Sequence, residues 1–170
     1  MNHFPVPISE EQRQKVANMP AIQRAFEFLA LGEEYSARRE WHHAIDNMTS
    51  YQMQMAASLA AEKNWHDRAI LALGKAKAYD DLETRFPLIH QGMLENYAGK
   101  RGLHLAWMYG VIRTESAFWE DARSPAGALG LMQVMPRTGQ ETARRLGLKN
   151  FNTNQLLQAE AQHAPSAAST

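Results

Sequence analysis

The sequence predicts an all-α protein, and three observations carry this prediction. Apolar residues recur at three- and four-residue intervals along most of the chain, which is the spacing of one helix face. Helix-start signals recur as well, in the form of a Ser or Thr three residues before a Gln and prolines at expected first turns. In the first half, we find no alternation of apolar and polar side chains that indicates a half-buried strand.

The composition is that of a globular protein. Of the 170 residues, 45% are hydrophobic and 21% charged, and Lys plus Arg equals Asp plus Glu at 18 each. This zero net charge gives no basic surface, so we expect no nucleic-acid partner. Cysteine is absent, which excludes disulfides and thiol chemistry. No apolar run approaches the roughly 20 residues that span a bilayer, so we expect no transmembrane segment. Residues 1–10 lack the basic and apolar regions of a signal peptide.

The first two helices are set by Ser, Pro and Gly signals. Ser9 and Gln12 form a capping box for a short helix that ends before Pro20. Pro20 begins the second helix, and Gly32 is expected to end it.

Three further helices are expected in the first half. Thr49 with Gln52 makes a second capping box, and Asn64 with Asp67 opens the last of the three. The expected ranges are 33–46, 50–63 and 64–79. Two similar Trp-His segments, one in the first range and one in the last, suggest stacked helical hairpins of the kind found in α-solenoids.

The second half begins after a polar junction, Asp80 to Pro87. Apolar spacing predicts further helices, and Gly99 to Gly102 predicts a turn between the first two of them. The expected ranges are 88–97, 103–119, 136–146 and 151–158.

One helix face in this half is apolar except for Glu115. The face is formed by Met108, Val111, Ile112, Glu115, Phe118 and Trp119. A buried glutamate is costly when ionised, and a carboxyl that keeps its proton near neutral pH can act as a general acid. The alternative is a structural glutamate paired with Arg113 or Arg123. Helix geometry alone leaves both interpretations open.

A loop with turn residues follows this helix. Ser124 precedes a proline, and Gly127 and Gly130 can bring backbone N–H groups close to a ligand. Gln133 is an amide within an apolar run, and Pro136 suits the first turn of the next helix.

Helix and loop together resemble the catalytic signature of the soluble lytic transglycosylases, bacterial enzymes that cleave peptidoglycan on a lysozyme-like fold. The positions that match are Glu115, Ser116, Phe118, Ala122, Ser124, Gly127, Ala128, Gly130, Met132 and Gln133, in order and without a gap. The Leu-Glu-Thr-Arg-Phe-Pro run at the junction also resembles the end of the helical superhelix that precedes the catalytic domain in this family.

The resemblance implies a carbon–oxygen lyase that cleaves the bond between N-acetylmuramic acid and N-acetylglucosamine. Glu115 would serve as the single general acid and base, forming 1,6-anhydromuramic acid ends without a cofactor or metal. Glu120 and Asp121 are expected to be solvated. The family's substrate-binding positions correspond to Ser124, Gln133, Met135 and Thr138. Ser124 could equally serve to form the turn before Pro125 in place of binding substrate. Met135 could equally pack in the core.

The resemblance also predicts the domain organisation. We expect a helical-hairpin segment at residues 1–85, an incomplete lysozyme-like catalytic domain at residues 86–158 and a disordered tail at residues 159–170. The chain is therefore expected to be a C-terminally truncated fragment. The partners implied are peptidoglycan glycan strands, and the location implied is the periplasm, although this chain shows no signal peptide.

Two other functions are compatible with the sequence. One is an inactive fragment that binds glycan or a protein partner without turnover. The other is a hydrolase related to goose-type lysozyme, which would release reducing ends in place of anhydromuramic ends.

Overall fold

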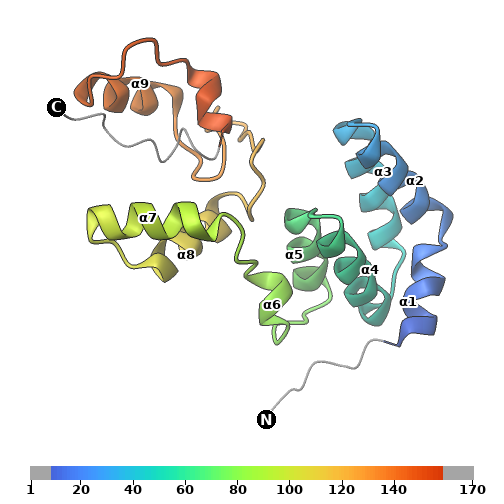
Figure 1. Cartoon of the computed structure of the whole chain (residues 1–170). Helices are drawn as coiled ribbons and strands as arrows, with labels where there is room; N and C mark the ends of the chain where they lie inside the picture. Colours follow the sequence, from blue (N-terminus) through green and yellow to red (C-terminus); the bar gives the residue numbers. More distant parts are fainter. Residues whose placement is uncertain (1–8, 159–170) are drawn as a thin grey trace. The chain divides into compact units, whose positions relative to one another are not determined.

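A computed structural model describes residues 9–158, and this part of the chain consists of helices joined by turns and loops (Figure 1). The all-α prediction is confirmed for these residues. The predicted disordered tail, 159–170, lies outside the described residues. Between residues 9 and 158, none of the helices combines the length and the apolar character needed to cross a membrane.

The chain divides into two compact units between Pro87 and Leu88. The first unit contains α1 (Glu10–Ala17), α2 (Pro20–Ala30), α3 (Glu34–Asp46), α4 (Ser50–Glu62), α5 (His66–Lys75) and α6 (Leu82–Arg85). The second contains α7 (Gln91–Arg101), α8 (Leu105–Glu115), α9 (Pro136–Arg145) and the 3-10 helix η1 (Thr153–Leu157).

The helix starts of the first unit follow the predicted signals in part. Thr49 and Gln52 form the predicted reciprocal capping box at α4, and Pro20 is the first residue of α2. Ser9 precedes α1, but its side chain makes no capping hydrogen bond, so the capping box predicted with Gln12 is wrong.

The start of α5 also differs from the prediction, because Asp67 has another partner. Trp65 is the residue that precedes α5, and Asn64 lies before it with a left-handed φ of 58°. The Asp67 side chain is buried, and its Oδ2 accepts hydrogen bonds from Arg38 Nη1 at 2.6 Å and from Arg68 Nε at 2.9 Å. A charge-assisted contact between α3 and α5 therefore takes the place of a helix cap.

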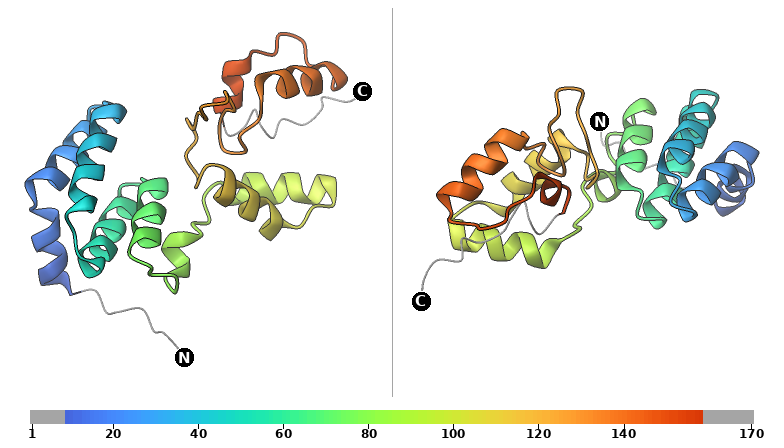
Figure 2. Two further views of the ribbon diagram at one scale, coloured as in Figure 1. Left: turned by 180° about the vertical axis from the view of Figure 1, so that it is seen from behind. Right: turned by 90° about the horizontal axis from the view of Figure 1, so that it is seen from above.

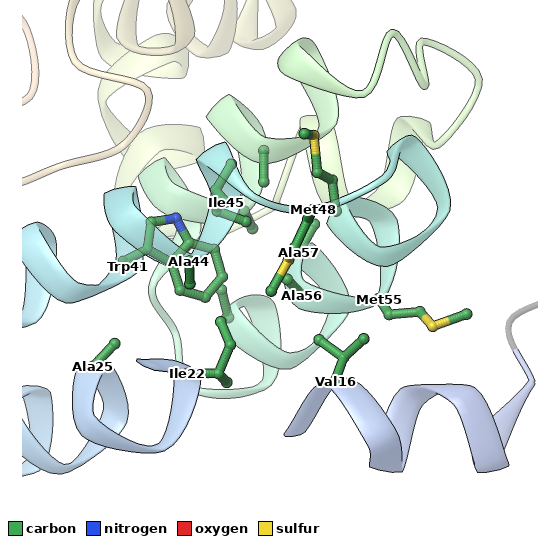
Figure 3. Close-up of a cluster of buried hydrophobic side chains, with 14 of the residues drawn as sticks. Val16, Ile22, Ala25, Trp41, Ala44, Ile45, Met48, Met55, Ala56 and Ala57 are labelled. Atoms are coloured by element: carbon green, nitrogen blue, oxygen red, sulfur yellow. The ribbon is translucent and has the colours of Figure 1, made fainter. Parts of the chain in front are cut away.

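Helices α1 to α5 share one apolar core (Figure 3). In this core α2 packs against α3, α4 against α5, and α1 against α4. Trp41 and Trp65 meet edge to face with ring centroids 5.3 Å apart, and Phe26 lies 5.9 Å from Trp41. The larger side chains that are most deeply buried here are Val16, Ile22, Met55 and Leu73.

The second unit places α7 beside α8 (Figures 1 and 2). Helix α7 continues past the predicted turn because Gly102, and not Gly99, takes the left-handed conformation, with a φ of 63°. A 3-10 helix replaces the α-helix predicted over 151–158, and it packs against α9. Gly139 permits this approach, because a Cβ at that position would lie 3.0 Å from Leu156 Cδ1.

The Asp67 contact predicts a large effect on the stability of the first unit. Asp67→Asn is expected to lower the free energy of unfolding by about 2 kcal/mol, because the buried carboxylate that two guanidinium groups of low exposure share is replaced by a neutral amide. Urea unfolding followed by circular dichroism measures the change. Asp46→Asn is the matched control, because Asp46 pairs with Lys75 at an exposed position. Equal destabilisation by both substitutions would contradict the assignment.

Candidate active site

Helix α8 ends at Glu115, earlier than the predicted end at Trp119. Ser116 is the capping residue, and Ala117 and Phe118 follow with left-handed φ values of 51° and 68°. Two successive non-glycine residues in this conformation are uncommon, and they redirect the chain immediately after the glutamate. Phe118 and Trp119 therefore do not continue the face of α8.

The redirected chain is held by the burial of Phe118. Its ring packs against Tyr109 of α8, with the centroids 6.1 Å apart. The Tyr109 hydroxyl donates a hydrogen bond to the carbonyl oxygen of Ile89 at 3.0 Å. Burial raises the pKa of Tyr109, and the negative charge of Glu95 adds to the rise. The phenol is therefore protonated at neutral pH and keeps its donor role.

The side chain of Glu115 is exposed, in contrast to Met108 and Ile112 on the same helix. The prediction of a carboxyl enclosed by an apolar face is wrong for the described residues, because the reversal after α8 carries Phe118 away from that face. What remains is an accessible carboxyl at the end of a packed helix.

The loop between α8 and α9 is closed by short antiparallel bridges. Leu129 pairs with Arg123 on one side and with Val134 on the other. Gly127 and Gly130 have φ values of 91° and 75°, which agrees with the turn roles expected for these glycines. The loop is therefore a small structure of its own, fixed by main-chain hydrogen bonds.

Ser124 and Gln133 both bind the backbone of this loop. Ser124 Oγ accepts a hydrogen bond from the Ala128 amide at 3.0 Å, which is the turn chemistry considered as its alternative role. Gln133 Nε2 donates to the carbonyl oxygens of Ala122 and Gly130 at 3.2 and 2.9 Å. Among the described residues, these contacts leave the serine hydroxyl proton and the Gln133 amide oxygen available to a ligand.

Met135 and Thr138 lie at the start of α9. Met135 is the residue before the helix and Pro136 its first residue, as predicted. The Met135 side chain is 42% exposed, which argues against the core-packing alternative, and Thr138 is exposed. The structure thus brings Ser124 and Gln133 together in one loop, with Met135 and Thr138 directly after it and Glu115 on the preceding helix.

One contact of this region was missed by the sequence analysis. Glu120 is not simply solvated, because its Oε1 lies 2.7 Å from Nε2 of His90. The two residues are 30 positions apart, so no spacing rule could connect them.

The available chemistry is proton transfer by a carboxyl, supported by hydroxyl and amide hydrogen bonds. Residues 9–158 contain no group of three or more His, Cys, Asp or Glu side chains that could hold a metal ion.

Two family models match the chain. Residues 15–82 match the soluble lytic murein transglycosylase L domain, and residues 92–163 match the transglycosylase SLT domain. The soluble lytic murein transglycosylase of Escherichia coli K12 is 29% identical over 142 residues, which are 83% of this chain and 22% of that protein.

Solved structures agree with these matches. The lytic transglycosylase Slt from Pseudomonas aeruginosa, solved as an inactive Glu-to-Gln mutant, has a TM-score of 0.88 and 40% identity, covering 94% of this chain and 26% of that one. The 70-kDa soluble lytic transglycosylase from Escherichia coli has a TM-score of 0.79 and 26% identity, covering 92% and 26% of the two chains. The chain therefore spans about a quarter of the length of these relatives.

The two hydrogen bonds of Gln133 predict a structural effect of its removal. Gln133→Ala is expected to destabilise the second unit by about 1–2 kcal/mol, because two loop carbonyls each lose one hydrogen bond. Amide hydrogen exchange of the loop measures this effect. Gln140→Ala, at an exposed position of α9, is the matched control. An unchanged exchange rate in Gln133→Ala would mean that the side chain does not brace the loop.

Proposed function

The chain belongs to the soluble lytic murein transglycosylase family, and from this premise we propose that it cleaves peptidoglycan glycan strands with Glu115 as its general acid and base. The observation that carries the proposal is the accessible carboxyl at the end of α8, followed at once by the loop of Ser124 and Gln133. A glycan polymer can reach a carboxyl in this position.

In the proposed reaction Glu115 transfers one proton in each direction. The carboxylic acid protonates the oxygen that links N-acetylmuramic acid to N-acetylglucosamine, and the bond between this oxygen and C1 breaks. The resulting carboxylate accepts the proton of the muramic C6 hydroxyl while the oxygen of this hydroxyl forms a bond to C1. The products are a free N-acetylglucosamine end and a 1,6-anhydromuramic acid end, and water is not consumed.

A single carboxyl is sufficient for this route. Ordinary glycosidases use two carboxyl groups at defined separations. Here the nearest acids in sequence are Glu120, which is bound to His90, and Asp121, which is exposed. The Pseudomonas aeruginosa relative, inactive as a Glu-to-Gln mutant, further supports a glutamate in this role.

Ser124, Gln133, Met135 and Thr138 are proposed to contact the glycan. The hydroxyl proton of Ser124 and the amide oxygen of Gln133 supply the polar contacts, and Met135 supplies apolar surface. A peptidoglycan substrate would place the activity in the periplasm.

One observation favours a second candidate, a helical module that binds glycan without turnover. Glu115 is exposed, whereas a general acid is ordinarily held in a site that excludes water. In this case the loop and α9 would bind the glycan and Glu115 would transfer no proton.

Glu115→Gln distinguishes the two candidates. The enzyme hypothesis predicts that the variant releases at least about a hundredfold less soluble muropeptide from sacculi, with unchanged helical content, because the substitution is nearly isosteric. Mass spectrometry of the products is the measurement, and Asp121→Asn is the control that should retain activity. Near wild-type turnover by Glu115→Gln would remove Glu115 from the mechanism.

The mass of the products separates the transglycosylase from the lysozyme-type hydrolase. Muropeptides short by one water indicate anhydro ends, whereas hydrolysis gives reducing ends. Binding of bulgecin A, which is present in a solved complex of the 70-kDa relative, gives a readout independent of turnover. A folded chain that binds glycan or bulgecin A and releases no product would support the binding module.

A further inference from the structure

His90 and Glu120 connect two segments on either side of α7 and α8. His90 Nε2 lies 2.7 Å from Glu120 Oε1, and the side chains are 30% and 47% exposed. With its proton on Nε2, the imidazole donates to the carboxylate. This contact joins the residue before α7 to the segment that follows α8.

Glu120 stands at the junction of the two parts of the candidate site. On its N-terminal side, the turn after Glu115 is closed by the Trp119 amide, which donates to Ser116 O at 3.1 Å. On its C-terminal side, Ala122 O accepts from the Gly130 amide at 2.8 Å and from Gln133 Nε2 at 3.2 Å. Glu120 therefore lies between the turn that follows Glu115 and the loop that carries Ser124 and Gln133.

His90 is a fixed point on the other side of this contact. Its φ of 57° is left-handed, and its carbonyl accepts the first hydrogen bond of α7 from the Leu94 amide at 2.9 Å. The carbonyl oxygen of the preceding residue, Ile89, accepts a hydrogen bond from the Tyr109 hydroxyl of α8. The Leu94 side chain is fully buried, so the segment that carries His90 is anchored in the core of the second unit.

We propose that the His90–Glu120 pair is a clamp that sets the position of Glu115 relative to the loop of Ser124 and Gln133. His90 and Glu120 are positioning residues in this scheme and do not touch the substrate. The effect of the pair on catalysis rests on the proposed function. The effect of the pair on the structure of the turn is independent of that function.

The expected consequence is local. A partly exposed contact between two polar side chains adds little to the stability of a whole domain. A misplacement of about 1 Å at a reacting group, however, can reduce a rate by on the order of a hundredfold. Loss of the clamp is therefore expected to change turn dynamics and turnover more than the unfolding midpoint.

Hydrogen exchange tests the clamp without any need for activity. In Glu120→Ala, which removes the acceptor, amide exchange over residues 116–122 is expected to be about tenfold faster, with exchange in α5 unchanged. Asp121→Ala, which removes the adjacent exposed acid, is the matched control. Equal exchange over 116–122 in wild type and Glu120→Ala would overturn the clamp.

A double-mutant cycle assigns the effect to the pair. His90→Asn is suitable because asparagine tolerates the left-handed conformation at this position. If the two residues act together, the double variant His90→Asn with Glu120→Ala exchanges no faster than either single variant. Additive increases would show that each residue acts separately and would overturn the pair.

Turnover of sacculi tests the positioning of Glu115. Glu120→Ala is expected to lower kcat about tenfold with little change in KM, because substrate contacts are retained while the Glu115 carboxyl is displaced. A raised KM with unchanged kcat would overturn the positioning role. Absence of turnover by the wild-type chain would contradict the proposed function. The hydrogen-exchange result alone would then test whether the pair acts as a clamp.

Discussion

The second unit depends on the reversal of the chain immediately after Glu115. Two left-handed residues, Ala117 and Phe118, are unfavourable by themselves, and the burial of the Phe118 ring against Tyr109 offsets their cost. Tyr109 is in turn tied to the segment before α7. The reversal leaves the carboxyl at an accessible helix end and directs the chain into the loop that carries Ser124 and Gln133. The accessible carboxyl and the placement of the loop thus share one physical cause.

Much of the fold was predictable because its signals are local. The Thr49 capping box and the proline at the start of α2 depend on neighbouring residues, and the structure contains both. The predicted end of α8 was wrong for an instructive reason. Phe118 is apolar and buried, as the three- and four-residue spacing predicts. However, it reaches the core because the chain reverses direction after α8, and not because the helix continues. Apolar periodicity reports burial and cannot report the path of the chain.

The resemblance proposed the residues of the candidate site, and their roles stay predictions. The environment of these residues could not be predicted, because the exposure of Glu115 and the backbone contacts of Gln133 follow from three-dimensional packing. Asp67 is a second example of an environment that the sequence could not predict. Its position at a helix start suggested a helix cap, whereas its partner Arg38 lies on another helix. His90 and Glu120 had no sequence signal at all, because their contact spans a helical hairpin.

The packing order in the first unit has a consequence for biosynthesis. Its helices pack mainly against neighbours in sequence, α2 against α3 and α4 against α5, with α1 closing on α4. Contacts of short sequence separation form quickly and require no residue beyond Pro87. During translation this unit can therefore complete its core while the second unit is still being synthesised. The nascent chain would then present a folded domain in place of exposed apolar helices.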